Sequence, residues 1–177
     1  MKKAIRNYLF RRFRENRGYS LAELIVIIVV MGILASAVGF TIKNVNENSR
    51  IAVAADNALA NMHYAQQTAM AESADVNFAV SSGTNSYSAR YAVSTRHPGG
   101  EYLKSPADPT QNLTVTLNQA ESKGVSITSG YAGVITFNSD GIPYYSGGGV
   151  LTGEVTLMTL NAKSSLVLQP SGFAEIR

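Results

Sequence analysis

Gly18, Tyr19 and Glu23 are the positions near the start of the chain whose types and spacing predict chemistry. The Gly18-Tyr19 bond follows a basic, polar leader and precedes a long apolar run, and it is the only plausible processing point in this segment. Cleavage there would create a new α-amino group on Tyr19 and leave the apolar run in the mature chain. Glu23 places one carboxylate inside the start of that run, and a carboxylate in such surroundings usually marks function.

The apolar run is long enough to predict a membrane-spanning helix. No residue from Leu24 to Phe40 is charged. At 1.5 Å per helical residue this run covers roughly 25 Å, against about 30 Å for the hydrocarbon core of a bilayer. Residues 19–22 and 41–42 bring it to spanning length, so we predict a span that ends at about residue 42.

Charge separates the leader from the rest of the chain. Residues 1–18 contain 7 basic residues and 1 acidic residue, a net charge of +6, which leaves 8 basic and 11 acidic residues, or −3, in the remainder. A leader this basic is expected to stay on the cytoplasmic side of a membrane. The mildly acidic remainder argues against a nucleic-acid surface, and we do not expect DNA as a partner. The chain has no cysteine, which excludes disulfides and thiolate metal sites.

The segment Gly18-Tyr19-Ser20-Leu21-Ala22-Glu23-Leu24 resembles the processing motif of type IV prepilins and of the pseudopilins of type II secretion. The resemblance implies that a prepilin peptidase cuts after Gly18 and methylates the amine of Tyr19. It also implies that Glu23 sets the register of parallel helices during filament assembly. Three partners for Glu23 stay open: the amine of its own Tyr19, the amine of a neighbouring subunit, and lipid headgroups.

One long helix is predicted to follow the leader, over residues 19–74. After Lys43 the apolar residues recur at three- and four-residue steps, which is typical of a helix with one buried face. The predicted buried stripe consists of Ala52, Ala55, Leu59, Met62, Ala65 and Ala69.

From Val76 onward, short alternating β-branched segments separated by turn residues predict strands. The predicted strands are 76–80, 87–94, 112–117, 124–128, 134–138, 154–160, 164–168 and 172–176. Short links between them favour antiparallel pairing. We therefore predict an α+β fold in which a long N-terminal helix, its lower half transmembrane, packs on a C-terminal antiparallel β-sheet domain. The expected domains are a cleaved leader (1–18), the helix (19–74) and a β-rich soluble domain (75–177).

The C-terminal part, through residues 134–141 and 166–172, is similar to the H-type minor pseudopilins. The resemblance implies a structural subunit of a type II secretion pseudopilus, with prepilin peptidase and other pilins or pseudopilins as partners. It also implies location in the bacterial inner membrane, with the C-terminal domain in the periplasm or outside. The alternative is a minor type IV pilin involved in pilus assembly or DNA uptake. No nucleophile–base arrangement, Walker loop or metal cluster is present in the sequence, so we expect no enzyme activity, cofactor, metal or small-molecule substrate.

Overall fold

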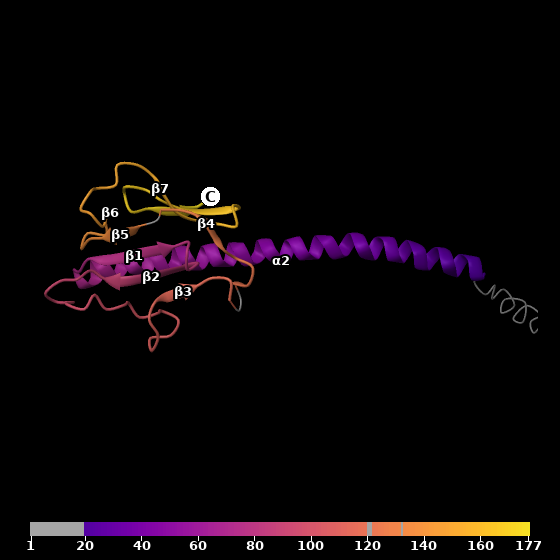
Figure 1. Ribbon diagram of the computed structural model, residues 1–177, viewed down its shortest axis with the longest axis horizontal. Helices are drawn as coiled ribbons and strands as arrows, with labels where there is room; N and C mark the ends of the chain where they lie inside the picture. Colours follow the sequence, from indigo (N-terminus) through magenta and orange to yellow (C-terminus); the bar gives the residue numbers. More distant parts are fainter. Residues whose placement is uncertain (1–19, 120–121, 132) are drawn as a thin grey trace, which may run out of the picture. The chain divides into compact units, whose positions relative to one another are not determined.

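A computed structural model describes residues 20–119, 122–131 and 133–177; for residues 37–44 it describes the backbone only. Gly18, Tyr19 and the leader lie outside the described residues. The described chain is a mixed α+β protein, with helix α2 (Leu21–Glu72) followed by strands in antiparallel sheets (Figure 1). The chain divides between Asn44 and Val45 into two compact units, each of which is described by itself below.

Two antiparallel sheets build most of the second unit. The five-stranded sheet has the order β3-β2-β1-β5-β6, and the four-stranded sheet has the order β4-β7-β8-β9. In the five-stranded sheet the strands are β1 (Val76–Ser81), β2 (Ser86–Tyr91), β3 (Thr114–Thr116), β5 (Val134–Phe137) and β6 (Pro143–Tyr145). In the four-stranded sheet they are β4 (Ile127–Ser129), β7 (Val155–Leu160), β8 (Ser164–Leu168) and β9 (Ala174–Ile176). Both sheets lie beside the second half of α2, so their inner faces share one core with it (Figure 1).

The part of α2 within this unit contributes a face rich in alanine to that core. Its buried residues are Ile51, Ala54, Ala55, Ala58, Met62, Ala65 and Ala69. Because alanine side chains are short, the sheets can approach the helix backbone closely. The predicted stripe is therefore correct for Ala55, Met62, Ala65 and Ala69, but Ala52 is exposed and Leu59 is only half-buried. The buried face is centred nearer to Ala58 than the three- and four-residue spacing indicated.

Gln66 ties the helix to both sheets. Its Nε2 donates hydrogen bonds to the carbonyl of Gly141 at 2.8 Å and to that of Gly172 at 3.2 Å. Gly141 lies in the turn between β5 and β6, and Gly172 lies between β8 and β9. Both glycines have positive φ values, 76° and 85°. A Cβ on Gly172 would lie 2.5 Å from Nε2 of Gln66, so these turns need glycine for both conformation and space.

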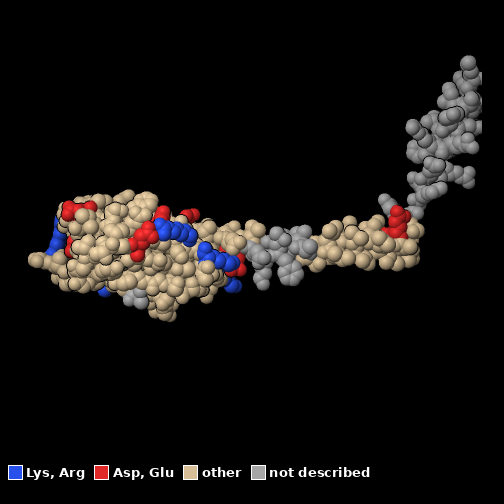
Figure 2. Space-filling model, turned by 90° about the horizontal axis from the view of Figure 1, so that it is seen from above, with Lys and Arg blue, Asp and Glu red and all other residues tan. Residues whose placement is uncertain are grey.

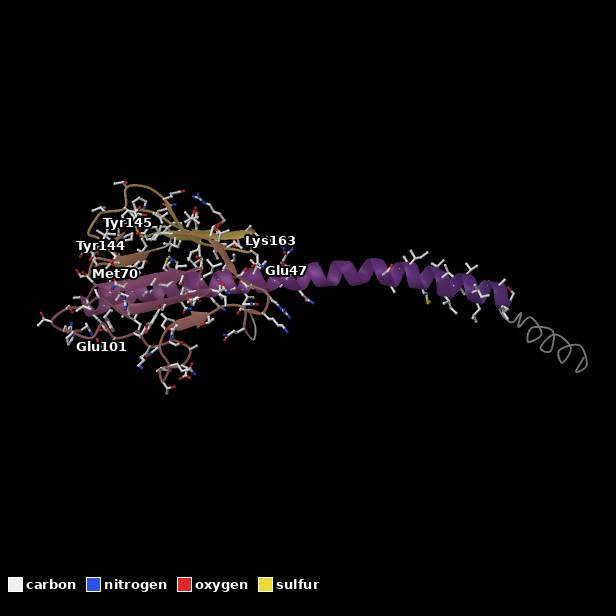
Figure 3. All side chains as sticks on the ribbon, viewed as in Figure 1. Glu47, Met70, Glu101, Tyr144, Tyr145 and Lys163 are labelled. Carbon is white, nitrogen blue, oxygen red and sulfur yellow. The ribbon has the colours of Figure 1, made fainter. Side chains whose placement is uncertain are left out.

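The two ends of the second unit carry different side chains. Figure 3 shows Lys163 close to Glu47 at one end, where Nζ of Lys163 lies 3.1 Å from Oε1 of Glu47. Met70 and Tyr144 lie at the other end (Figure 3). There the hydroxyl of Tyr144 donates a hydrogen bond of 2.7 Å to Asp75. An exposed ion pair therefore joins the helix to the turn before β8 at the first end, and a phenol–carboxylate hydrogen bond joins Tyr144 to Asp75 at the second.

Each of the predicted strands overlaps an observed strand, but several boundaries differ and one strand was not predicted. The second predicted strand (87–94) ends early, at Tyr91, because Ser94 and His97 close a turn in which the N–H of Ser94 bonds the carbonyl of His97. Strand β6 was missed because Pro143 opens it and it has only three residues, too few to show alternation. The turn predicted at residues 138–141 is confirmed, with the N–H of Gly141 donating to the carbonyl of Asn138.

The described part of helix α2 bears on the predicted membrane span. Among the residues whose side chains the structure describes, no helix combines the length and hydropathy that crossing a membrane requires. The side chains of residues 37–42, at the end of the predicted span, lie outside that description.

Candidate processing and assembly site

Helix α2 begins at Leu21, the third residue after Gly18 in the sequence, and Ser20 caps its first turn. The backbone N–H of Glu23 donates a hydrogen bond of 3.2 Å to Oγ of Ser20. The N–H of Leu24 donates to the carbonyl of Ser20 at 3.1 Å, the first intrahelical bond. Ser20 is thus the N-cap residue, and Ser20 to Glu23 has the Ser-x-x-Glu pattern of a capping box.

Glu23 lies in the first turn of α2 with its side chain exposed. A negative charge at this end of a helix interacts favourably with the unsatisfied N–H groups and the helix dipole. No ion pair to Glu23 occurs within the described ranges 20–119, 122–131 and 133–177. One of the three partners left open, the amine of Tyr19, lies outside those residues, and the other two do not belong to this chain, so the pairing and the register role of Glu23 stay predictions.

The first unit exposes an apolar helix surface on every side. Its large apolar side chains are between 40% and 78% exposed from Leu21 to Leu34. They are Leu21, Leu24, Ile25, Val26, Ile27, Ile28, Val29, Val30, Met31, Ile33 and Leu34. Figure 2 shows this segment as an uncharged surface with acidic atoms at one end. Apolar surface of this extent marks a site that contacts another protein or a membrane.

Sequence reasoning identified Gly18, Tyr19 and Glu23 but did not assign Ser20 a role. The available signal was the spacing of Ser20 and Glu23 immediately before an apolar run, which is a helix-start pattern. The cap defines the start of the helix at Leu21, whereas the predicted scissile bond lies outside the described residues.

The described residues offer little else that resembles a reactive centre. Within residues 20–119, 122–131 and 133–177, no three His, Cys, Asp or Glu side chains come together as a metal site requires. The expectation that the protein binds no metal stays a prediction.

Comparison with known proteins matches two family models to this chain. The model described as type II transport protein GspH matches residues 54–172, well over half of the 177 residues. The model of the prokaryotic N-terminal methylation motif matches residues 13–39, which include Gly18, Tyr19 and Glu23. Comparison with curated proteins and with solved structures gave no match.

Proposed function

This chain belongs to the GspH family of type II transport proteins, and from that premise we propose that it is a minor pseudopilin, a structural subunit of the type II secretion pseudopilus. The N-terminal methylation motif supports processing by a prepilin peptidase, with cleavage after Gly18 and methylation of the Tyr19 amine. We propose a structural role rather than a catalytic one. The match to the GspH model favours the secretion system over the type IV pilus as the place of action.

One observation carries the assembly part of the proposal. The second unit completes its own core, whereas the side chains of residues 21–34 are exposed on all sides of the helix. Such a surface needs apolar neighbours outside the chain. In the proposed cycle, the inner membrane supplies them before assembly, and the parallel helices of other pilins or pseudopilins supply them afterwards.

Glu23 would bias the exchange between these two environments. Apolar side chains lose little when helices replace lipid, so they favour neither state strongly. A carboxylate costs about 2.5–3.5 kcal/mol at the centre of a bilayer on insertion scales, and less near its edge. Pairing of Glu23 with the amine of a neighbouring subunit would recover part of that cost and select one axial register.

The first test is the mass of the mature N-terminus. The expected chain begins at N-methylated Tyr19, and an intact Met1 terminus in cells with active prepilin peptidase would contradict the proposal. The second test compares Glu23→Ala with Glu23→Asp. Both variants should be inserted and processed, but Glu23→Ala should be absent from purified filaments and should reduce secretion, while Glu23→Asp should retain part of both. Unchanged incorporation of Glu23→Ala would remove the register role.

A further inference from the structure

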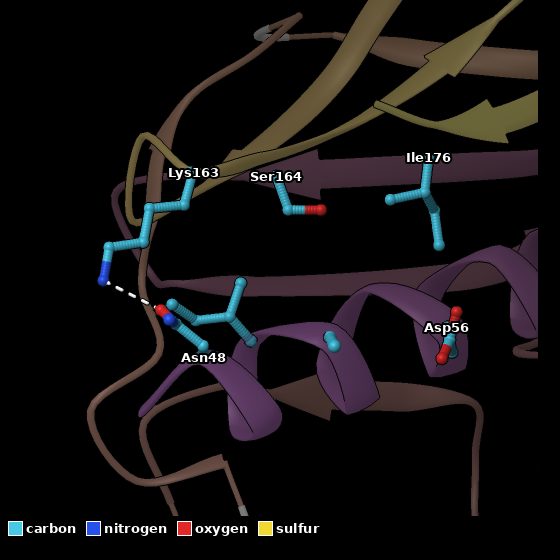
Figure 4. Close-up of a pocket in the computed structure, with 7 residues that line it drawn as sticks. Asn48, Asp56, Lys163, Ser164 and Ile176 are labelled. Carbon is cyan, nitrogen blue, oxygen red and sulfur yellow. Dashed lines mark hydrogen bonds between the residues drawn. The ribbon is translucent and has the colours of Figure 1, made fainter. Parts of the chain in front are cut away.

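The end of the second unit at which the chain enters it carries basic side chains bonded to different neighbours. Nη1 of Arg50 donates a hydrogen bond of 3.2 Å to the carbonyl of Lys123. Nζ of Lys163 lies 3.1 Å from Oε1 of Glu47 and donates a bond of 3.2 Å to Oδ1 of Asn48, which Figure 4 shows as a dashed line. We call this end the basal surface; it consists of residues 45–50, 122–124 and 161–163.

Asn161 fixes the two loop segments of the basal surface against each other. Its Nδ2 donates a hydrogen bond of 2.9 Å to the carbonyl of Gly124, and its Oδ1 accepts one of 2.7 Å from the N–H of Ser126. Its own N–H donates to the carbonyl of Ser126 at 2.9 Å. The basic side chains therefore extend from a backbone that is already ordered, so a ligand bound there has little loop to immobilise.

The basal surface is positively charged, whereas the rest of the second unit is negatively charged. Its charged residues are three basic and one acidic, a net charge of +2. Lys43 and Glu121 lie near these segments in the sequence, and their side chains are outside the described residues. Their charges are opposite, so they leave the net charge of this end unchanged. The other charged residues of 51–177 are four basic and eight acidic, or −4.

Arg50 and Lys123 are the two cations of the basal surface that remain for a ligand. Lys163 is paired with Glu47, whereas no ion pair to Arg50 or Lys123 occurs within residues 20–119, 122–131 and 133–177. Both residues are exposed. The bond to the Lys123 carbonyl uses one N–H of a guanidinium group that has five. A guanidinium next to an ammonium group is suited to a phosphate group as ligand.

The length of the chain that joins the two units decides which phosphate groups this surface can meet. The predicted span ends at about residue 42, and the second unit begins at Val45. Three residues reach at most about 11 Å in any arrangement of the two units. The headgroup layer extends about 5–7 Å beyond the hydrocarbon core. An anionic surface acts over about 8 Å more at physiological ionic strength. A membrane that holds the first unit therefore brings its headgroups within range of the basal surface.

We propose that the basal surface binds the phosphate groups of anionic phospholipids, with Arg50 and Lys123 as the main contacts. The inference rests on the proposed function, in which the first unit lies in the inner membrane before assembly. The negative charge on the rest of the second unit favours the same orientation, since an anionic membrane repels it. These lipid contacts must break when the subunit leaves the membrane, so they stabilise the stored subunit relative to the filament.

The test measures which lipid gathers at the basal surface. The chain has no cysteine, so Ser49→Cys, at an exposed position beside Arg50, carries a single fluorophore. The full processed chain is reconstituted in phosphatidylcholine bilayers that contain traces of phosphatidylglycerol or phosphatidylcholine with the same nitroxide at the top of the acyl chain. Labelled phosphatidylglycerol should quench half of the fluorescence at about one-fifth of the concentration, the factor expected from one Lys or Arg at an anionic surface. Equal quenching by the two lipids would overturn the proposal.

Substitutions locate the contact. Arg50→Gln and Lys123→Gln should each reduce the preference for labelled phosphatidylglycerol, and the two together should abolish it, whereas Arg50→Lys should retain most of it. Lys104→Gln is the matched control, because it removes the same charge between β2 and β3, outside the basal surface. A preference that survives the double substitution, or that Lys104→Gln reduces equally, would overturn the proposal.

Two changes of solution test the chemistry of the contact. Salt at about 1 M shortens the Debye length to about 3 Å and should remove most of the preference. A preference that salt leaves unchanged would exclude an electrostatic contact and overturn the proposal. Inorganic phosphate at constant ionic strength should not compete with the lipid. Competition would show that the surface takes free phosphate instead, which also overturns the proposal.

A fluorophore in the first unit separates a failure of this inference from a failure of the proposed function. Met31→Cys should be quenched by phosphatidylcholine that carries the nitroxide at the end of its acyl chain. Absence of that quenching would mean that the first unit does not lie in the bilayer, so the proposed membrane location and this inference would both be wrong. Quenching at Met31→Cys without a lipid preference at Ser49→Cys would overturn this inference alone.

Discussion

The two halves of helix α2 are both rich in apolar residues, but among the described residues only the second half is covered by other parts of the chain. In the second half, Met62 and Ala65 are fully buried under two sheets. In the first half, Met31 is 65% exposed and Ile33 is 64% exposed. The comparison teaches that apolar content does not say whether a helix surface is buried within its own fold or exposed. The sequence next to each half does indicate this, because the strands that cover a helix face come directly after the second half.

The largest effect is expected from the same substitution made in each half. Met62→Ala should lower the free energy of unfolding of the second unit by about 3 kcal/mol, because it leaves a cavity in the core. Met31→Ala should change that free energy by almost nothing, since its side chain is exposed. Denaturant unfolding of the full chain in micelles, followed by tyrosine circular dichroism, measures both. Equal losses would mean that the two halves do not differ as described.

A smaller loss is expected at the contact that holds both sheets to the helix. Gln66→Ala removes two hydrogen bonds and leaves the carbonyls of Gly141 and Gly172 without that donor. We expect the free energy of unfolding to fall by about 1–2 kcal/mol. Gln67→Ala is the matched control, because Gln67 is exposed on the same helix. Amide exchange in the turns at Gly141 and Gly172 should also become faster in the Gln66 variant and stay unchanged in the Gln67 variant.

The cap of the first half should act locally. Ser20→Ala removes the acceptor for the Glu23 N–H, and it should destabilise the first turn by about 1 kcal/mol. The expected result is faster amide exchange at Glu23 with unchanged unfolding of the second unit, and Ser20→Asp should restore the wild-type rate. A change in the unfolding of the second unit would show that the two halves are coupled energetically.

The smallest effect concerns alkaline pH and the second unit alone. Burial, and then the hydrogen bond to Asp75, raises the pKa of Tyr144 from 10.0 to about 12. The contribution of the protonated Tyr144 to the free energy of unfolding is therefore complete below pH 10 and is lost as the pH rises towards 12. Tyr144→Phe should weaken that alkaline loss by about a few tenths of a kcal/mol, because the site is half-exposed. Unfolding at pH 9 and pH 11.5 measures it, and Asp140→Asn should behave as wild type.

Much of the fold could be predicted because its causes are local. The alternating residues of Ser164–Leu168 predicted β8 with the correct bounds, and the turn at Asn138 was predicted from its residues. The exposure of Ala52 could not be predicted, because the sheet edge at β9 that fails to cover it lies far away in sequence. At the site, Glu23 was selected from its surroundings in the sequence, but the partners left open for it are the Tyr19 amine, a neighbouring subunit and lipid headgroups. All three lie outside the described residues, so its role stays a prediction.

The hydrogen bonds from Gln66 to the turns at Gly141 and Gly172 limit where foreign groups can be attached to this protein. Side chains added at Gly141 or Gly172 would collide with the helix, at 2.8 Å from the sulfur of Met70 in the first case. By contrast, a Cβ on Gly147 meets no atom within 4 Å, and Gly147 does not have the positive φ of Gly141 and Gly172. Epitope tags and fluorophores intended to follow the protein in living cells therefore belong at position 147, where a cysteine introduced for labelling would be unique in the chain.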